Sequence, residues 1–488
     1  MGHVDLRELA FQMRSDDLRQ YATDLLVRKP DRMAAAEVLN LMSYLVACEY
    51  VTAEAHVATI EFKYKGTTDE RYINHAVALA KAHIYFAFGK FSSMETAANK
   101  FLESYNEVPD IEAGEYLDIM RLKAQKHLIL DEFVDLRKID EEVQQYKSDS
   151  NSPNILYLIN SIHSMRLLAD GEFIKAMELA QINLRIAENH NYSGLMAPIE
   201  TLFVIATCYM ALGKRDKCNE KYLELKKLSI SLRMWPWYFI ASGNISRDLA
   251  HKSDYKSALA IVREERELLS TFEFKHELDF IPDVNELYVR FLIGDSERMN
   301  ILFKRIPKLA IVEQIKAVLR EQNGEDMISY INSLPNISPR ERTFKYVALA
   351  DYYKDKESIA VDYMEQALIS GEQSGATEIF LRQFHLANIT LKAAIRIKSV
   401  YAENLQALLT ERIRQKEFQN REGVIGTLTI RELEIVRHLT TGKSIKEIGS
   451  NLHVSMNTMK THLRNIYRKL EVDGREKAVE KAKDLMLI

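Results

Sequence analysis

The chain has 488 residues, of which only 17 are glycine and 9 are proline, whereas 47% are hydrophobic and 28% are charged. Sandwiches and barrels need frequent turn residues, so this composition excludes an all-β protein and predicts an all-α one. The net charge of −4 is unevenly distributed, because residues 421–488 contain 13 basic and 9 acidic side chains and the rest of the chain is acidic. A small basic module on a large acidic body indicates that only the module binds a polyanion.

The three cysteines, Cys48, Cys208 and Cys218, have no metal-ligand spacing. We therefore expect free thiols in a reducing compartment, a cytoplasmic protein and no bound metal. The most apolar stretch, residues 195–213, contains a single charge at Glu200. Its polar residues fit a helix of a soluble repeat better than a membrane span, so we expect no membrane partner.

The body of the chain contains an internal repeat. Small or acidic turn residues recur at intervals of 42, 40, 42, 40 and 41 residues, at Gly89, Asp131, Gly171, Gly213, Ser253 and Gly294. Each interval predicts one helical hairpin, and a further hairpin is expected at residues 347–369 around Asp355. Within a repeat, small residues and aromatic residues occur at helical spacing, as at Ala206, Tyr209 and Gly213. This arrangement resembles the tetratricopeptide pattern, although the repeat period here is longer.

Stacked hairpins of this kind form a concave groove lined by the first helix of each hairpin, which suits a peptide or a partner helix. Candidate groove residues are asparagines whose amides could bond a peptide backbone and the two tryptophans beside Pro236. These are Asn160, Asn244, Asn285, Trp235 and Trp237. Ordinary packing on helix faces is the alternative role for each of them.

No residue pattern indicates catalysis. His276-Glu277 lacks the second histidine of a zinc protease motif, and Gly442-Lys443-Ser444 lacks the leading glycine of a phosphate loop because Arg437 stands there. We therefore expect no catalytic residues, no cofactor and no enzymatic activity.

The last 60 residues contain several helix-start signals. Thr429-x-x-Glu432, Ser444-x-x-Glu447 and Asp473-x-x-Glu476 have capping-box spacing, and Ser455 is a natural N-cap. They predict helices over residues 430–441, 445–452, 456–471 and 474–486. The short second helix, a tight turn and a longer third helix are typical of a helix-turn-helix.

The third of these helices has a basic outward face without acids. That face comprises Asn457, Thr458, Lys460, Thr461, Arg464, Asn465 and Arg468. Lys460 and Arg464 are one turn apart, so both are expected to reach base edges in one major groove. The residues expected to contact phosphates are Lys443, Thr458, Lys469 and Arg475.

These residues resemble a known family. The runs Leu428-Thr429-x-Arg431-Glu432, Gly442 to Ile448, Ser455-x-x-Thr458-Met459-Lys460-x-His462, Ile466-Tyr467-x-Lys469-Leu470 and Arg475-x-x-Ala478-Val479 are similar to the LuxR-type helix-turn-helix domain. The resemblance implies a four-helix domain whose third helix enters the major groove of double-stranded DNA and whose fourth commonly pairs subunits. Met459 and Gly449 stand where valine and alanine are usual.

Together these patterns predict four segments: an N-terminal helical cap over residues 1–70, a tetratricopeptide-like sensor or interaction domain over 71–390, a linker helix and loop over 391–426, and the DNA-binding domain over 427–488. We expect a homodimeric transcriptional regulator whose repeats bind a peptide or protein effector. A peptide quorum-sensing receptor is the narrower alternative. A scaffold that titrates a protein partner, with DNA binding secondary, is the other.

Overall fold

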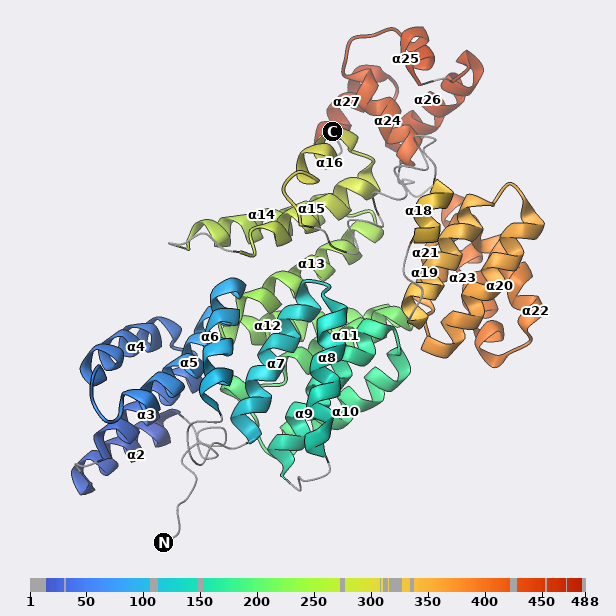
Figure 1. The fold of residues 1–488 in the computed structure, drawn as a ribbon. Coiled ribbons are helices and arrows are strands. Elements are labelled where there is room, and N and C mark those ends of the chain that lie inside the picture. Colours follow the sequence, from blue (N-terminus) through green and yellow to red (C-terminus); the bar gives the residue numbers. More distant parts are fainter. Residues whose placement is uncertain are drawn as a thin grey trace.

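The computed structural model describes residues 15–29, 32–105, 113–147, 152–272, 277–307, 309, 315, 327–333, 338–421, 428–452, 454–470 and 472–484. Within these ranges the regular structure is helical, in agreement with the predicted all-α class. Figure 1 shows a row of helical hairpins, a separate group of helices beside it and a small domain at the C-terminus.

After α2 (Ser15–Arg28), the described residues form seven successive helical hairpins. They are α3 (Met33–Val46) with α4 (Tyr50–Tyr64), α5 (Glu70–Ala87) with α6 (Phe91–Tyr105), α7 (Ala113–Ile129) with α8 (Phe133–Gln144), α9 (Pro153–Asp170) with α10 (Phe173–Asn189), α11 (Ile199–Ala211) with α12 (Arg215–Ser231), α13 (Trp235–His251) with α14 (Tyr255–Ser270), and α15 (Phe280–Ile293) with α16 (Ser296–Leu302). Most of their apolar faces belong to one continuous core.

The predicted turn positions all adopt left-handed backbone conformations. The φ angles of the six residues lie between 58° at Asp131 and 79° at Gly294. A residue in this conformation lets the chain reverse directly after a helix, as at Gly171, where the following amide of Glu172 donates to the carbonyl of Leu167 at 2.9 Å. The repeat period therefore corresponds to a recurrent backbone geometry.

The N-terminal helical cap expected for residues 1–70 contains a hairpin of the repeat. Cys48 has a φ of 57° and lies 41 residues before Gly89, so α3 and α4 form a hairpin in register with the rest. Cysteine is not a characteristic turn residue, which is why the sequence pattern did not indicate this hairpin. Residues 1–14 lie outside the described part of the chain.

The chain continues as a second group of helices, which we call the return bundle. Its elements are α18 (Met327–Ser333), α19 (Pro339–Tyr352), α20 (Glu357–Ser374), α21 (Glu378–Arg382), α22 (Ala387–Ile397) and α23 (Val400–Arg421). The predicted hairpin at residues 347–369 is confirmed as α19 and α20. Tyr352 and Glu357 flank its turn.

The expected single linker helix from residue 391 is divided in the structure. Lys398 has a φ of 51°, which ends α22 before α23 begins at Val400. Buried residues of both helices, such as Ala394 and Leu405, share a core with α19 and α20. Much of the segment is thus part of the return bundle. The expected loop at residues 422–426 lies outside the described residues.

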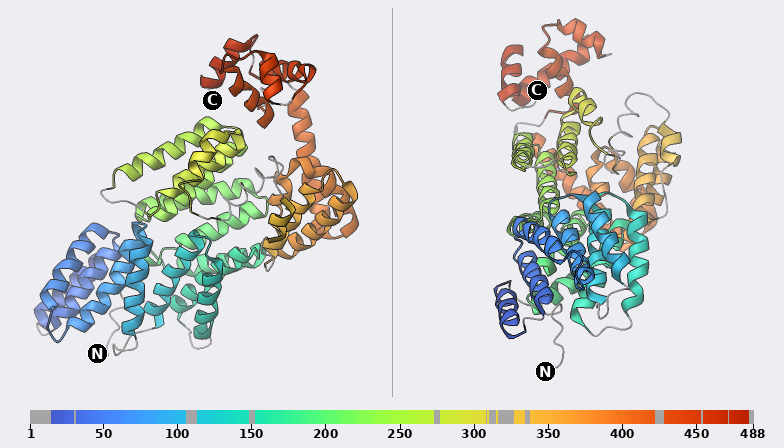
Figure 2. Two further views of the ribbon diagram at one scale, coloured as in Figure 1. Left: turned by 45° about the horizontal axis from the view of Figure 1, so that its top comes forward. Right: turned by 60° about the vertical axis from the view of Figure 1, so that its left-hand side comes forward.

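The return bundle packs back onto the turn ends of the hairpins (Figure 2). The amide of Thr377 donates to the carbonyl of Ala211 at 2.7 Å, at the end of α11. At the α9–α10 turn, a Cβ on Gly171 would lie 2.4 Å from the Cβ of Arg340, so only glycine permits this approach. The bundle therefore closes one side of the hairpin array.

A buried charged cluster joins the first helices of consecutive hairpins. Arg121 of α7 donates to Asp118 at 3.0 Å and to Glu200 of α11 at 3.1 Å. Nε2 of His83 in α5 lies 2.7 Å from the carboxylate of Asp118. All four side chains are buried. Burial opposes ionisation of Asp118, but the charges of His83 and Arg121 outweigh it and lower the pKa of this carboxyl below its usual value.

Neutral side chains extend this cluster to two further helices. Ser161 of α9 donates to Glu200, and Gln125 of α7 lies 3.4 Å from the same carboxylate. Nε1 of Trp237 in α13 donates to Gln125 at 2.9 Å. The cluster therefore connects α5, α7, α9, α11 and α13.

The apolar stretch of the sequence falls in this region. One helical segment, Gly194–Ala211, is long and apolar enough to cross a membrane by length and composition, and about two thirds of it is buried inside the protein. It includes Glu200 of the charged cluster.

We expect Arg121→Met to lower the free energy of unfolding by about 3–5 kcal/mol, because the change leaves Asp118 and Glu200 buried without their shared cation. Urea unfolding followed by circular dichroism at pH 7 measures this. Arg396→Met is the control: it removes a solvent-exposed ion pair with Asp362 and is expected to change stability little. Equal losses in the two variants would contradict a central role for the buried cluster.

Candidate nucleic-acid interface and effector cavity

Local capping interactions define the C-terminal helices. They are α24 (Ile430–Leu439), α25 (Ile445–Asn451), α26 (Met456–Leu470) and α27 (Arg475–Asp484). Reciprocal capping boxes at Thr429 with Glu432 and at Ser444 with Glu447 confirm two predicted helix starts. Ser455 accepts a hydrogen bond from the amide of Thr458 at 3.2 Å, which confirms it as a cap. The helix boundaries agree with the prediction within two residues, apart from residues 485–486, which are not described.

The apolar stripes of these helices form the domain core. Met459, Leu463 and Ile466 of α26 are buried against α24 and α27. Gly449 lies at the crossing of α25 and α26, where an added Cβ would be 3.1 Å from the carbonyl oxygen of Val454. His453, in the turn between these helices, lies outside the described residues. Because the apolar stripe of α26 is buried in the domain core, the opposite face of this helix is exposed to solvent.

The exposed face of α26 is the predicted recognition face. Asn457, Thr458, Lys460, Thr461, Arg464 and Arg468 are exposed, and Asn465 is half-buried. α26 contains no acidic residue, and within the described part of the chain Lys460, Arg464 and Arg468 have no carboxylate partner. The face is therefore positively charged and open to a ligand.

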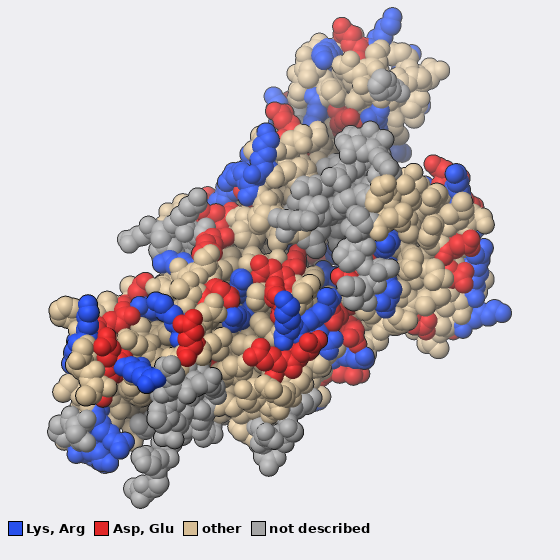
Figure 3. Space-filling model, viewed as in Figure 1, with Lys and Arg blue, Asp and Glu red and all other residues tan. Residues whose placement is uncertain are grey.

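The residues expected to contact phosphates occupy two kinds of environment. Lys443 and Thr458 are exposed. Lys469 donates to Glu432 at 2.7 Å, and Arg475 donates to the carbonyl oxygens of Leu439 and Lys443. Lys469 and Arg475 thus also hold α26 and α27 against α24. The face of the hairpin array in Figure 3 carries side chains of both signs of charge.

The C-terminal domain contacts the last hairpin directly. Nη1 of Arg437 in α24 donates to the carbonyl of Gly294, the left-handed residue that ends α15. Buried residues of α15, including Ile293, continue into the core of the domain. The partners Arg437 and Gly294 are 143 residues apart, so no local pattern indicated this contact.

The hairpin array contains a cavity of about 400 Å³, which we call the effector cavity. One face of each of the first helices α11, α13 and α15 lines it, represented by Phe203, Ile240 and Val284. Arg340 of α19 and Arg382 of α21 close it from the return bundle. Its volume is within the range of about 300–1,000 Å³ typical of ligand sites.

Three of the five candidate groove residues line this cavity, namely Asn244, Asn285 and Trp237. Asn285 is buried and donates to the carboxyl of Glu265 at 3.1 Å, while Nδ2 of Asn244 donates to the carbonyl of Ile240 at 2.9 Å. Trp237 is fully buried and belongs to the charged cluster. These three residues therefore stabilise the helices and also line the effector cavity.

The other two candidates lie elsewhere. Asn160 is buried within α9, and Trp235 packs against Phe272 with ring centroids 5.4 Å apart. No sequence pattern indicated the arginines of the effector cavity. Arg247 lies one turn after Asn244 on the same helix face, so the helical period extended from Asn244 could have indicated it.

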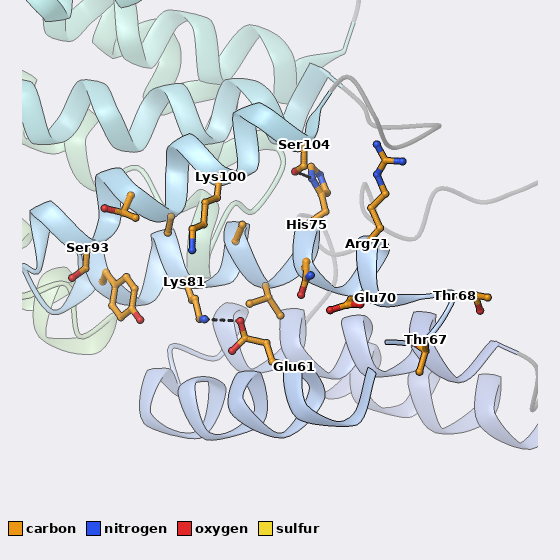
Figure 4. A pocket seen from close by; sticks show the side chains of 16 residues that line it. Glu61, Thr67, Thr68, Glu70, Arg71, His75, Lys81, Ser93, Lys100 and Ser104 are labelled. Carbon is orange, nitrogen blue, oxygen red and sulfur yellow. Dashed lines mark hydrogen bonds and ion pairs between the residues drawn. The ribbon is translucent and has the colours of Figure 1, made fainter. Parts of the chain in front are cut away.

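A second, larger cavity of about 810 Å³ lies between α4, α5 and α6 (Figure 4). Lys81 and Glu61 face each other across it at 2.6 Å, and Nδ1 of His75 lies 2.6 Å from the hydroxyl of Ser104. Its lining mixes cations, acids and hydroxyls, with Arg71, Lys81 and Lys100 beside Glu61 and Glu70. Within the described residues, no three His, Cys, Asp or Glu side chains are grouped so that they could hold a metal ion.

The C-terminal domain is similar to domains of known proteins. Residues 426–482 match the family described as "Bacterial regulatory proteins, luxR family". Similar proteins include the monoamine regulon transcriptional regulator of Klebsiella aerogenes, 32% identical over 24% of this chain and 54% of the relative, and the nitrate/nitrite response regulator protein NarP of Escherichia coli, 36% identical over 17% and 38%. The response regulator protein VraR of Staphylococcus saprophyticus is 32% identical over 30% of this chain and 60% of its own length. The matches thus span 38–60% of these relatives. Residues 426–482 are a luxR-family helix-turn-helix domain.

Proposed function

We propose that this protein is a sequence-specific DNA-binding transcriptional regulator in which the helical hairpins sense a peptide or protein effector. The observation that supports DNA binding best is the exposed, acid-free basic face of α26 within a luxR-family domain. Two of the similar proteins are a transcriptional regulator and a nitrate/nitrite response regulator, which agrees with this proposal.

In this proposal α26 enters the major groove. Lys460 and Arg464 contact base edges there, while Lys443 and Thr458 contact the phosphate backbone. We further propose a homodimer, because two such domains would bind two half-sites and gain both affinity and a defined spacing.

Helix α15 is the proposed connection between effector and DNA. Residues of α15 such as Val284 and Tyr288 line the effector cavity, and the same helix ends at Gly294, where Arg437 of the DNA-binding domain docks. A ligand that favours one position of α15 would therefore change the position of the domain, to the extent that its affinity differs between the two arrangements.

We expect residues 421–488 to fold and bind DNA in isolation, because the capping boxes and most of the apolar core of the domain lie within this segment. Affinity should fall steeply as salt rises, since cationic contacts to phosphates release counterions. Fluorescence anisotropy with a labelled duplex between 50 mM and 200 mM salt measures this. Affinity that is independent of salt would contradict the assigned basic face.

Lys460→Ala and Arg464→Ala should each cost about 1–3 kcal/mol of binding free energy at a preferred site and much less on random DNA, because the two side chains are placed to contact bases. Lys443→Ala should weaken binding to all sequences to a similar extent. Competition binding assays with specific and random duplexes distinguish these patterns. Equal losses on both duplexes for Arg464→Ala would assign this side chain to the phosphate backbone.

Arg437→Ala should release the DNA-binding domain from α15, because it removes the side chain that donates to the carbonyl of Gly294. Small-angle scattering of the full chain is expected to show a larger radius of gyration than for the unchanged protein. Arg468→Ala, a change on the exposed face of α26, is the matched control and should leave the radius unchanged. An unaltered radius for Arg437→Ala would show that this contact does not position the domain.

A further inference from the structure

The arginines around the effector cavity outnumber the carboxylates available to them. Glu378 of α21 accepts hydrogen bonds from Arg215, Arg382 and Arg412, so one carboxylate serves three cations. Asp248, an acid in the cavity wall, is held by Asn219 at 2.8 Å and by Lys252 at 2.7 Å. Positive charge therefore remains in excess on this side of the cavity.

Arg247 is the least compensated of these cations. Nη2 of Arg247 donates only to the neutral amide oxygen of Asn285, at 3.3 Å, and the guanidinium lies 5.5 Å from the ring centroid of Tyr288. Its Nε is buried and has no hydrogen-bond partner. Burial raises the pKa of the nearby Glu265 to about 8, which reduces the negative charge that this carboxyl presents to Arg247 at pH 7. Burial also lowers the pKa of Arg247 itself.

The arginines around Arg247 also affect His251, a nearby histidine. His251, one turn further along α13, is within 2.7 Å of the hydroxyl of Tyr288, which also lies 3.4 Å from Nη1 of Arg382. Burial and the surrounding arginines lower the pKa of His251 to about 3, so the histidine is neutral. A buried donor without a partner, in a cavity with surplus positive charge, favours an anionic ligand.

Part of the cavity wall is apolar. Phe203, Ile240, Phe280 and Val284 lie on the first helices α11, α13 and α15. Of the four lining arginines, Arg247 shares α13 with Ile240, and the others come from α12, α19 and α21. Among the charged residues that line the cavity, there are four arginines and two aspartates, and Glu378 stands just behind together with Arg412, so positive charge is in excess. A carboxylate attached to an apolar body would supply a counter-charge and match the apolar part of this lining.

We propose that the effector cavity binds a carboxylate attached to an apolar or aromatic group, with Arg247 and Arg382 holding the carboxylate. The proposal deepens the proposed sensing function and rests on it. The C-terminus of a short peptide and a free aryl or alkyl carboxylic acid share this chemistry. A guanidinium presents parallel N–H donors that match the two carboxylate oxygens.

The test uses the full-length chain and its own fluorescence. The chain has two tryptophans, and Trp235→Phe leaves Trp237, in the cavity wall, as the sole reporter. The probes are a pool of random tripeptides with free C-terminal carboxylates, the same pool with C-terminal amides, and 4-phenylbutyrate. Saturable fluorescence changes with a carboxylate probe are expected, and the amide pool should require at least tenfold higher concentrations.

Two variants test the site in the same background. Arg247→Gln should weaken binding of the carboxylate probe at least tenfold. Asn244→Asp is nearly isosteric, so it should fold normally, and its new charge one turn before Arg247 should weaken binding similarly by repelling the carboxylate. Arg185→Gln, on the exposed side of α10, is the matched control and should leave binding unchanged.

The outcomes separate the site from the regulatory function. Binding of 4-phenylbutyrate as well as the free-acid peptides supports a site for small carboxylates, and binding of the peptides alone supports a peptide C-terminus. Equal binding of the amide pool, unchanged binding in both variants, or no binding of any carboxylate would overturn the proposal. DNA affinity measured with and without the probe is independent: bound probe without an effect on DNA would retain the site and reject its role in sensing.

Discussion

The shared contact of Arg121 with Asp118 and Glu200 is the interaction on which the hairpin array depends. A charge buried in a helical stack is costly unless its partners are held at hydrogen-bonding distance, and here one partner, Asp118, lies on α7 itself and the other, Glu200, on α11. The cluster therefore constrains the relative positions of the first helices that contribute to it, α5, α7, α9, α11 and α13. Because Trp237 belongs both to this cluster and to the effector cavity, the same constraint sets the geometry of the cavity wall.

The cavity and the DNA-binding domain share α15. Helices in a packed array move as rigid bodies, so a small rotation of α15 that suits a ligand would move its far end at Gly294, where Arg437 docks. The return bundle contributes Arg340 and Arg382 to the same cavity, although it follows the array in sequence. A ligand in the cavity would thus contact the array and the return bundle at once.

The distribution of charge separates the two proposed binding events. The surface of α26 exposes cations to solvent, where they suit a polyanion that is recognised along its length. The cavity instead places half-buried arginines such as Arg247 beside apolar side chains, where a single carboxylate would gain strong hydrogen bonds. One chain can therefore present positive charge to two chemically distinct ligands.

The features determined by the sequence alone are those with local causes. A turn residue every 41 residues or so predicts hairpins because a left-handed turn needs only its own residue and the helix before it. The capping boxes at Thr429 and Ser444 predict helix starts for the same reason. The turn at Cys48 was not predicted, because cysteine does not itself favour the left-handed conformation that it adopts between α3 and α4.

Only the tertiary structure decided which distant side chains meet. Arg215 and Glu378 are 163 residues apart, and the cavity that they border exists because the return bundle folds back onto the array. Asn244 and Asn285 line the cavity, but the asparagine pattern could not show that the amide of Asn285 is already bonded to Glu265, nor that Arg247 has no hydrogen bond to a carboxylate. Helical periodicity determines which face a residue occupies, whereas the charge balance of a cavity depends on every helix that reaches it.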